Sequence, residues 1–79
     1  MDFTSLIDRG ALLLAMPLSQ TKKGREKTLE LVEEWHSVCA SVDGKLGALP
    51  VYKREALLYL NKRLREKRLM IVAVDVEED

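Results

Sequence analysis

The sequence predicts a mainly α-helical domain, with three helices followed by a C-terminal β-strand. Residues 25–43 and residues 51–68 both repeat apolar side chains at the spacing of one helix face. Residues 69–76 form a dense apolar run rich in β-branched side chains, which favours a strand. A chain of 79 residues is long enough for one domain at most, so we treat residues 1–79 as a single small domain.

A net charge of zero conceals a separation of charge along the chain. There are 13 basic and 13 acidic residues, but residues 44–74 are strongly basic, while residues 75–79 include acidic residues and no basic ones. Any electrostatic role therefore belongs to one region of the chain rather than to the whole. The single cysteine, Cys39, excludes an internal disulfide and is typical of a reducing compartment, so we expect a cytoplasmic protein.

The first segment, about residues 3–16, is predicted to be a helix. Phe3, Leu6 and Leu13 fall on one helical face, but residues 11–16 are apolar on every side. Residues 11–16 could instead form a short strand. We prefer the helix because Ala, Leu and Met are good helix formers. Pro17 ends the element in either case.

Residues 25–43 are predicted to be an amphipathic helix with an acidic outer face. Trp35 lies at the centre of its apolar half, so we expect it in the core. The acidic face carries Glu30, Glu33 and Glu34. Ser19 and Thr21 are possible helix caps. A basic cluster surrounds Gly24, so either the helix begins late, near Arg25, or the cluster is kept for an anionic partner, and we interpret it as a solvated basic loop. Its members are Lys22, Lys23, Arg25 and Lys27.

Residues 51–68 are predicted to be a second amphipathic helix, and its outer face is basic. That face carries Arg54, Lys62, Arg65 and Arg68. Lys67 flanks the apolar stripe, where we expect its stem to cover the stripe and its charge to reach water. Leu58 stands on the basic side, on the same side as Leu69. The acidic and basic faces should point away from each other within one subunit, which leaves both for another molecule.

Residues 69–76 are predicted to be a strand whose backbone needs a partner. Three partners are possible: residues 11–16, the same strand of a second copy across a two-fold axis, or a sheet edge on another protein. The acidic tail, residues 77–79, would terminate the chain. The strand side chains that we expect to make contact are Ile71, Val72, Val74 and Val76.

No pattern in the sequence indicates catalysis, a cofactor or a metal. His36 and Cys39 are neighbours on one helix face, but a zinc site needs about four ligands, or three and a water. A catalytic pair needs an orienting third group and an oxyanion site, and the sequence identifies neither. We therefore predict no catalytic residue, no cofactor, no metal, no small-molecule substrate and no membrane segment.

The sequence thus predicts a non-enzymatic binding protein: an adaptor, an inhibitor or a chaperone-like regulator that acts as a homodimer or on a protein target. The predicted protein-binding residues are Ile71, Val72, Val74, Val76, Glu30, Glu33 and Glu34. The alternative is a nucleic-acid-binding regulator of helix-turn-helix or winged-helix type that uses residues 51–68. Its contact residues would be Arg54, Lys62, Arg65, Arg68, Lys22 and Lys23. Residues 43–50 are longer than the usual turn of that motif, which disfavours it.

Overall fold

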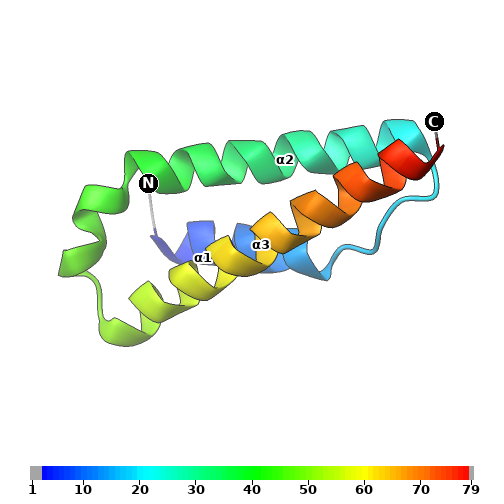
Figure 1. The fold of residues 1–79 in the computed structure, drawn as a ribbon. Helices are drawn as coiled ribbons and strands as arrows, with labels where there is room; N and C mark the ends of the chain where they lie inside the picture. The colour runs from blue at the N-terminus through cyan, green and yellow to red at the C-terminus, as the bar shows by residue number, and fades with distance from the viewer. Residues whose placement is uncertain (1–2, 79) are drawn as a thin grey trace.

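The computed structural model describes residues 3–78, which form an elongated bundle of three α-helices (Figure 1). Helix α1 spans Phe3–Ala15, α2 spans Lys22–Ser41 and α3 spans Val51–Glu78, and a short 3-10 helix, η1 (Asp43–Ala48), joins α2 to α3. Helices α1 and α3 run in the same direction, and α2 runs antiparallel to both (Figure 1). The bundle measures 45 × 18 × 16 Å. It is long because the 28 residues of α3 rise about 42 Å.

All three helices bury side chains at alternating spacings of three and four residues. This spacing keeps one seam of side chains facing the neighbouring helices, as in coiled coils and helical bundles. The buried residues are Leu6, Gly10 and Leu13 in α1; Arg25, Thr28, Val32 and Trp35 in α2; and Leu57, Leu60, Leu64, Lys67 and Ile71 in α3. We call these buried positions the inner seam. Two of its members, Arg25 and Lys67, are cations, and each donates hydrogen bonds to oxygen atoms of the bundle.

Trp35 lies in the core, which confirms the sequence prediction. Its indole Nε1 donates a hydrogen bond to the carbonyl oxygen of Leu6 at 2.8 Å, so its polar atom is satisfied inside the bundle. The ring lies directly against Gly10: a Cβ at that position would stand 2.8 Å from two ring carbons. Gly10 therefore lets the backbone of α1 approach the ring closely.

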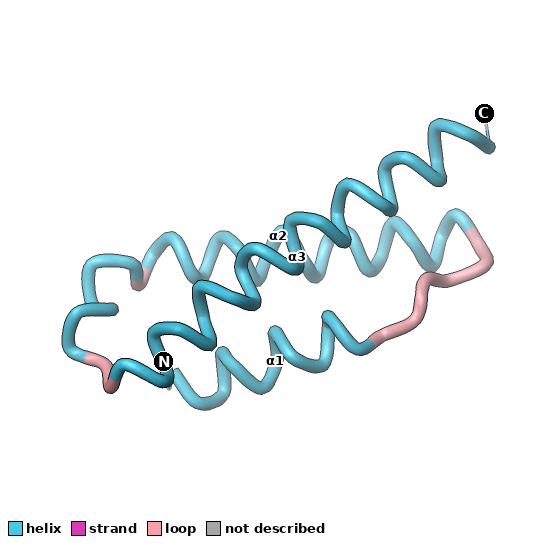
Figure 2. Tube along the Cα trace, turned by 60° about the horizontal axis from the view of Figure 1, so that its bottom comes forward, coloured by secondary structure: helices cyan, strands magenta, loops and turns pink. Residues whose placement is uncertain are grey.

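The predicted strand at residues 69–76 is wrong, because these residues continue α3 (Figure 2). No strand occurs within residues 3–78. Ile71 is 0% exposed and Val74 is half-buried, so both extend the inner seam beyond Arg68. A β-branched residue in a helix costs only about 0.5 kcal/mol relative to alanine, whereas burying isoleucine stabilises by about 1.5–3 kcal/mol. The helix also satisfies its own backbone, so no edge partner is required.

Lys67 caps the C-terminal end of α1 from the middle of α3. The side chain is 6% exposed, and Nζ donates to the carbonyl oxygens of Leu13, Leu14 and Met16. The last carbonyls of a helix have no partner within it, and a cation there also favours the helix dipole. The expectation that this charge reaches water is therefore wrong. Burial lowers the pKa of Lys67.

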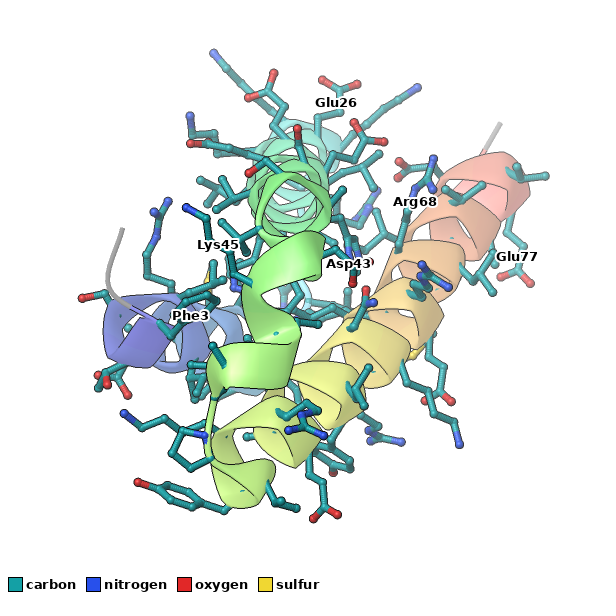
Figure 3. The ribbon with its side chains drawn as sticks, turned by 90° about the vertical axis from the view of Figure 1, so that its left-hand side faces the viewer. Phe3, Glu26, Asp43, Lys45, Arg68 and Glu77 are labelled. Atoms are coloured by element: carbon teal, nitrogen blue, oxygen red, sulfur yellow. The ribbon has the colours of Figure 1, made fainter. Side chains whose placement is uncertain are left out.

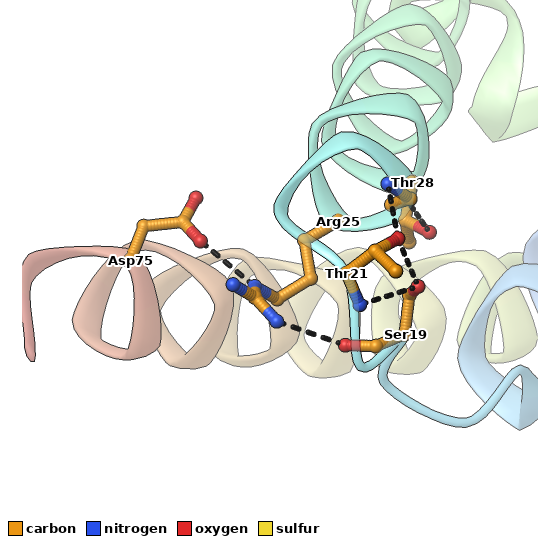
Figure 4. A network of polar contacts seen from close by, with 6 residues as sticks. Ser19, Thr21, Arg25, Thr28 and Asp75 are labelled. Carbon is orange, nitrogen blue, oxygen red and sulfur yellow. Dashed lines mark hydrogen bonds and ion pairs between the residues drawn. The ribbon is translucent and has the colours of Figure 1, made fainter. Parts of the chain in front are cut away.

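Arg25 fastens the far end of α3 to the start of α2 (Figure 4). Its side chain is 3% exposed, and Nε donates to Asp75 Oδ1 at 2.8 Å while Nη1 donates to the carbonyl oxygen of Ser19 at 3.1 Å. The solvated basic loop is therefore wrong for this residue. Helix α2 begins at Lys22, earlier than predicted, because Thr21 caps it: Oγ1 accepts from the Gly24 amide at 3.1 Å.

Candidate binding surfaces

Helix α3 carries a second row of side chains, which lies outside the core and in part borders the groove between α2 and α3. We call this row the outer seam, and it also follows spacings of four and three residues. Its members are Leu58, Lys62, Arg65, Leu69, Val72 and Val76. The four apolar members are 54%, 69%, 43% and 68% exposed, in chain order. A helix that presents two such seams has the pattern of an element that packs against more than one neighbour.

The four apolar side chains that the sequence predicts to make contact do not lie on one face of α3. Ile71 and Val74 face the bundle, where Ile71 is buried and Val74 is half-buried. Val72 and Val76 lie on the outer seam and are exposed. In a strand, the even-numbered residues 72, 74 and 76 would share one face. In the helix, residues 72 and 76 share a face with Leu69 instead.

The predicted acidic residues Glu30, Glu33 and Glu34 are all exposed on α2. Glu33 nevertheless pairs with Arg68 across the α2–α3 groove, with an Oε1–Nη2 distance of 3.4 Å. Figure 3 shows Arg68 directed toward α2, whereas Glu77 points away from the other helices. The two charged faces therefore meet at this point, contrary to the expectation. Both side chains of this pair are about half exposed, so the pair contributes only about 0–1 kcal/mol.

The predicted nucleic-acid-binding residues do not form one continuous basic track. Arg54 is half-buried at the start of α3, and its Nη2 donates to the carbonyl oxygen of Leu49 at 3.3 Å. Arg68 faces Glu33, as described above. Lys62 and Arg65 lie on the outer seam, while Lys22 and Lys23 begin α2 at the opposite end of the bundle from Arg54 (Figure 1).

His36 and Cys39 lie beside a hollow of about 320 Å³ between α2, η1 and α3. Apolar side chains such as Leu6, Leu46 and Leu57 line it, together with Asn61 and Arg65. A second, more open hollow of about 680 Å³ shares His36 and Arg65 and reaches Leu69 on the outer seam. The two hollows therefore lie side by side along the α2–α3 groove and share His36 and Arg65.

The chemistry of this groove does not favour nucleophilic catalysis. Burial raises the pKa of the Cys39 thiol to about 11, so it stays protonated and weakly nucleophilic at neutral pH. The pKa of His36 is lowered, mainly by burial and further by the charges of Arg65 and Arg68. The nearby Asn61 side chain opposes this shift in part. His36 Nε2 is buried without a hydrogen-bond partner among the described residues. Within the same residues, no three His, Cys, Asp or Glu side chains gather where they could hold a metal ion.

Sequence reasoning missed three residues that organise the bundle and one surface. The residues are Lys67, Arg25 and Asp75, and the surface is the outer seam. The spacing of Leu57, Leu60 and Leu64 could have been followed through Lys67 to Ile71, which would have predicted one long helix. No comparable pattern in the sequence identifies the atoms that accept hydrogen bonds from Lys67 and Arg25.

Comparison of the chain with protein-family models, curated proteins and solved structures found no match. No helix within residues 3–78 is both long and apolar enough to cross a membrane. A functional assignment therefore starts from the outer seam, the charged faces and the α2–α3 groove.

Proposed function

We propose that this chain is a non-enzymatic binding protein that acts through protein–protein contacts, with the outer seam of α3 as its contact surface. The observation that carries the proposal is the line of four exposed apolar side chains on α3, outside the core. Single exposed apolar residues are normal on a protein surface, but aligned ones mark interaction sites.

The charges within and beside the seam define the kind of partner that fits. Lys62 and Arg65 interrupt the apolar row, and their aliphatic stems can pack on an apolar partner while their charged ends reach its flanks. An amphipathic helix with acidic flanking residues meets both requirements. This partner suits an adaptor, an inhibitor or a chaperone-like regulator.

The same observations make a nucleic-acid partner the weaker fit. Proteins that follow a phosphate backbone neutralise several phosphates with a run of available cations. Here Arg54 donates to a backbone carbonyl, Arg68 faces a glutamate, and the two seam cations lie between Leu58 and Leu69. Apolar side chains on either side of the cations favour contact with a polypeptide.

Site-specific photo-crosslinking in the cells that naturally produce the chain tests the proposal. A photoreactive amino acid replaces Leu69 on the outer seam or, as a control, Leu12 on α1, which is exposed to nearly the same extent (69% and 67%). We expect one discrete crosslinked polypeptide from position 69, be it another protein or a second copy, and only diffuse labelling from position 12. Equal labelling from both positions, or a crosslink from position 69 to nucleic acid alone, would refute the proposal.

A further inference from the structure

We infer that the partner of the outer seam is a second copy of this chain, with the two α3 helices antiparallel about a two-fold axis near residues 70 and 71. This inference rests on the proposed function and names its partner. A two-fold dimer uses one surface patch twice, so the patch must be complementary to itself when it is reversed. The distribution of charge along α3 meets that condition.

From Lys62 onward, the exposed side chains on and beside the outer seam are basic, then apolar, then acidic. Lys62 and Arg65 come first, Leu69 and Val72 follow, and Glu77 lies near the end. A parallel pair would set cations against cations and carboxylates against carboxylates. An antiparallel pair sets the basic part of each helix against the acidic end of the other and keeps the apolar parts together. The charges therefore select the antiparallel arrangement.

The spacing of the outer seam fixes the register within that arrangement. With the axis between residues 70 and 71, Leu69 faces the partner subunit's Val72, and Val72 faces the partner subunit's Leu69. Val76 then faces the partner subunit's Arg65, whose stem can cover it. Glu77 comes within two residues of the position opposite the partner subunit's Lys62, so the long lysine side chain can reach it. Each contact occurs twice, and the four central side chains are apolar, as in the layers of a coiled coil.

The bundle leaves room for this partner. The four apolar members of the outer seam are exposed and the seam only borders the α2–α3 groove, so a second α3 can pack there without displacing α1 or α2. Glu77 already points away from the other helices (Figure 3). The facing segments, residues 62–78, extend over only about 25 Å. A contact this short buries a small area, so we expect a weak dimer with a dissociation constant on the order of 10–100 µM.

Sedimentation equilibrium of the purified chain tests the dimer. We expect the mass to rise from 9.0 kDa toward twice that value as the concentration increases through the range of that dissociation constant, from about 5 to 500 µM. Leu69→Asp should remain monomeric over the whole range, while Leu12→Asp should dimerise like the original chain. Circular dichroism of both variants confirms that the helices remain. A mass of 9.0 kDa at the highest concentration, or dimerisation of Leu69→Asp, would overturn the inference.

A charge exchange tests the antiparallel register independently of stability. Lys62→Glu places carboxylates beside the partner subunit's Glu77, and Glu77→Lys places cations beside the partner subunit's Lys62. Each variant alone should dimerise about 5–10-fold more weakly, because two exposed ion pairs become repulsive. An equimolar mixture of the two variants should regain nearly the original affinity, since both contacts are then attractive. A mixture as weak as its components would contradict this register.

The proposed function and the inference fail in different ways. A chain that stays monomeric while position 69 crosslinks to a different protein would overturn self-association and support the proposed function. A chain that stays monomeric and gives no discrete crosslink from position 69 would refute both.

Discussion

Replacing Asp75 by alanine should destabilise the protein far more than a surface carboxylate would. The Asp75 carboxylate accepts from Arg25 Nε at 2.8 Å, and the Arg25 side chain is 3% exposed. Removing one partner of a buried pair leaves an uncompensated charge and typically costs about 3–5 kcal/mol. Asp75 is itself 21% exposed, so water can reach part of the site. We therefore expect a loss near the lower end, about 3 kcal/mol.

Two further variants separate the buried charge from a general loss of contacts. Arg25→Met combined with Asp75→Ala should cost only about 1 kcal/mol, because the buried charge is removed together with the carboxylate that balanced it. Glu66→Ala breaks the exposed pair with Arg63 and should cost at most about 0.5 kcal/mol. Urea unfolding followed by Trp35 fluorescence measures all three free energies of unfolding. Amide hydrogen exchange should also speed up over residues 69–78 in Asp75→Ala, because that end of α3 loses its attachment.

The reasoning fails if Asp75→Ala costs no more than Glu66→Ala. It also fails if the double variant is less stable than Asp75→Ala alone, since the penalty would then not come from the buried Arg25 charge that has lost Asp75.

Four other substitutions and conditions test particular contacts. Gly10→Ala should destabilise by about 1–3 kcal/mol despite the better helix propensity of alanine, because its Cβ would meet the indole ring, whereas Gly44→Ala, with nothing within 4 Å, should be close to neutral in thermal unfolding. Lys67→Met should cost about 2–3 kcal/mol in urea unfolding, because the last carbonyls of α1 lose a charged donor. Because the pKa of His36 lies below 6.5 in the folded chain, the unfolded chain binds more protons as the pH falls through that value; stability should therefore drop below neutral pH, and His36→Gln should lack this part of the drop. With a pKa of about 11 against an ordinary value of 9.0, Cys39 should hold about 100-fold less thiolate, so a thiol reagent at pH 8 should label the folded chain that much more slowly than the urea-unfolded chain.

The helices could be predicted because their signal is local. Apolar side chains at helical spacing identified residues 25–43 and residues 51–68 as helices, and most of both ranges lies in α2 and α3. The same signal placed Trp35 in the core. The strand prediction was wrong because β-branched composition at residues 69–76 was given more weight than the spacing of the seam. Lys67 interrupts the apolar spacing from Leu64 to Ile71, because a lysine at a seam position is usually interpreted as the edge of an apolar stripe.

The contact surface could be predicted only in part, because the face on which a residue lies depends on the secondary structure around it. Val72 and Val76 are exposed on the outer seam, whereas Ile71 and Val74 support the core. Leu58 and Leu69 were correctly placed on one side of the basic helix. Their continuation through Val72 and Val76 became visible only when the helix was seen to run on to Glu78.

The sequence by itself determined that this chain forms amphipathic helices, where most of them lie and how charge is divided along them. These are properties of neighbours within a few residues, and the helical period converts them directly into faces. Only the tertiary structure showed that the cations of the inner seam are buried and that α3 continues to Glu78. Arg25 donates a hydrogen bond to Asp75, which lies 50 residues away in the sequence, and Lys67 donates to the carbonyl oxygen of Leu13, 54 residues away. A charge can be buried only where its partner is brought to it, and only the folded bundle brings those partners together.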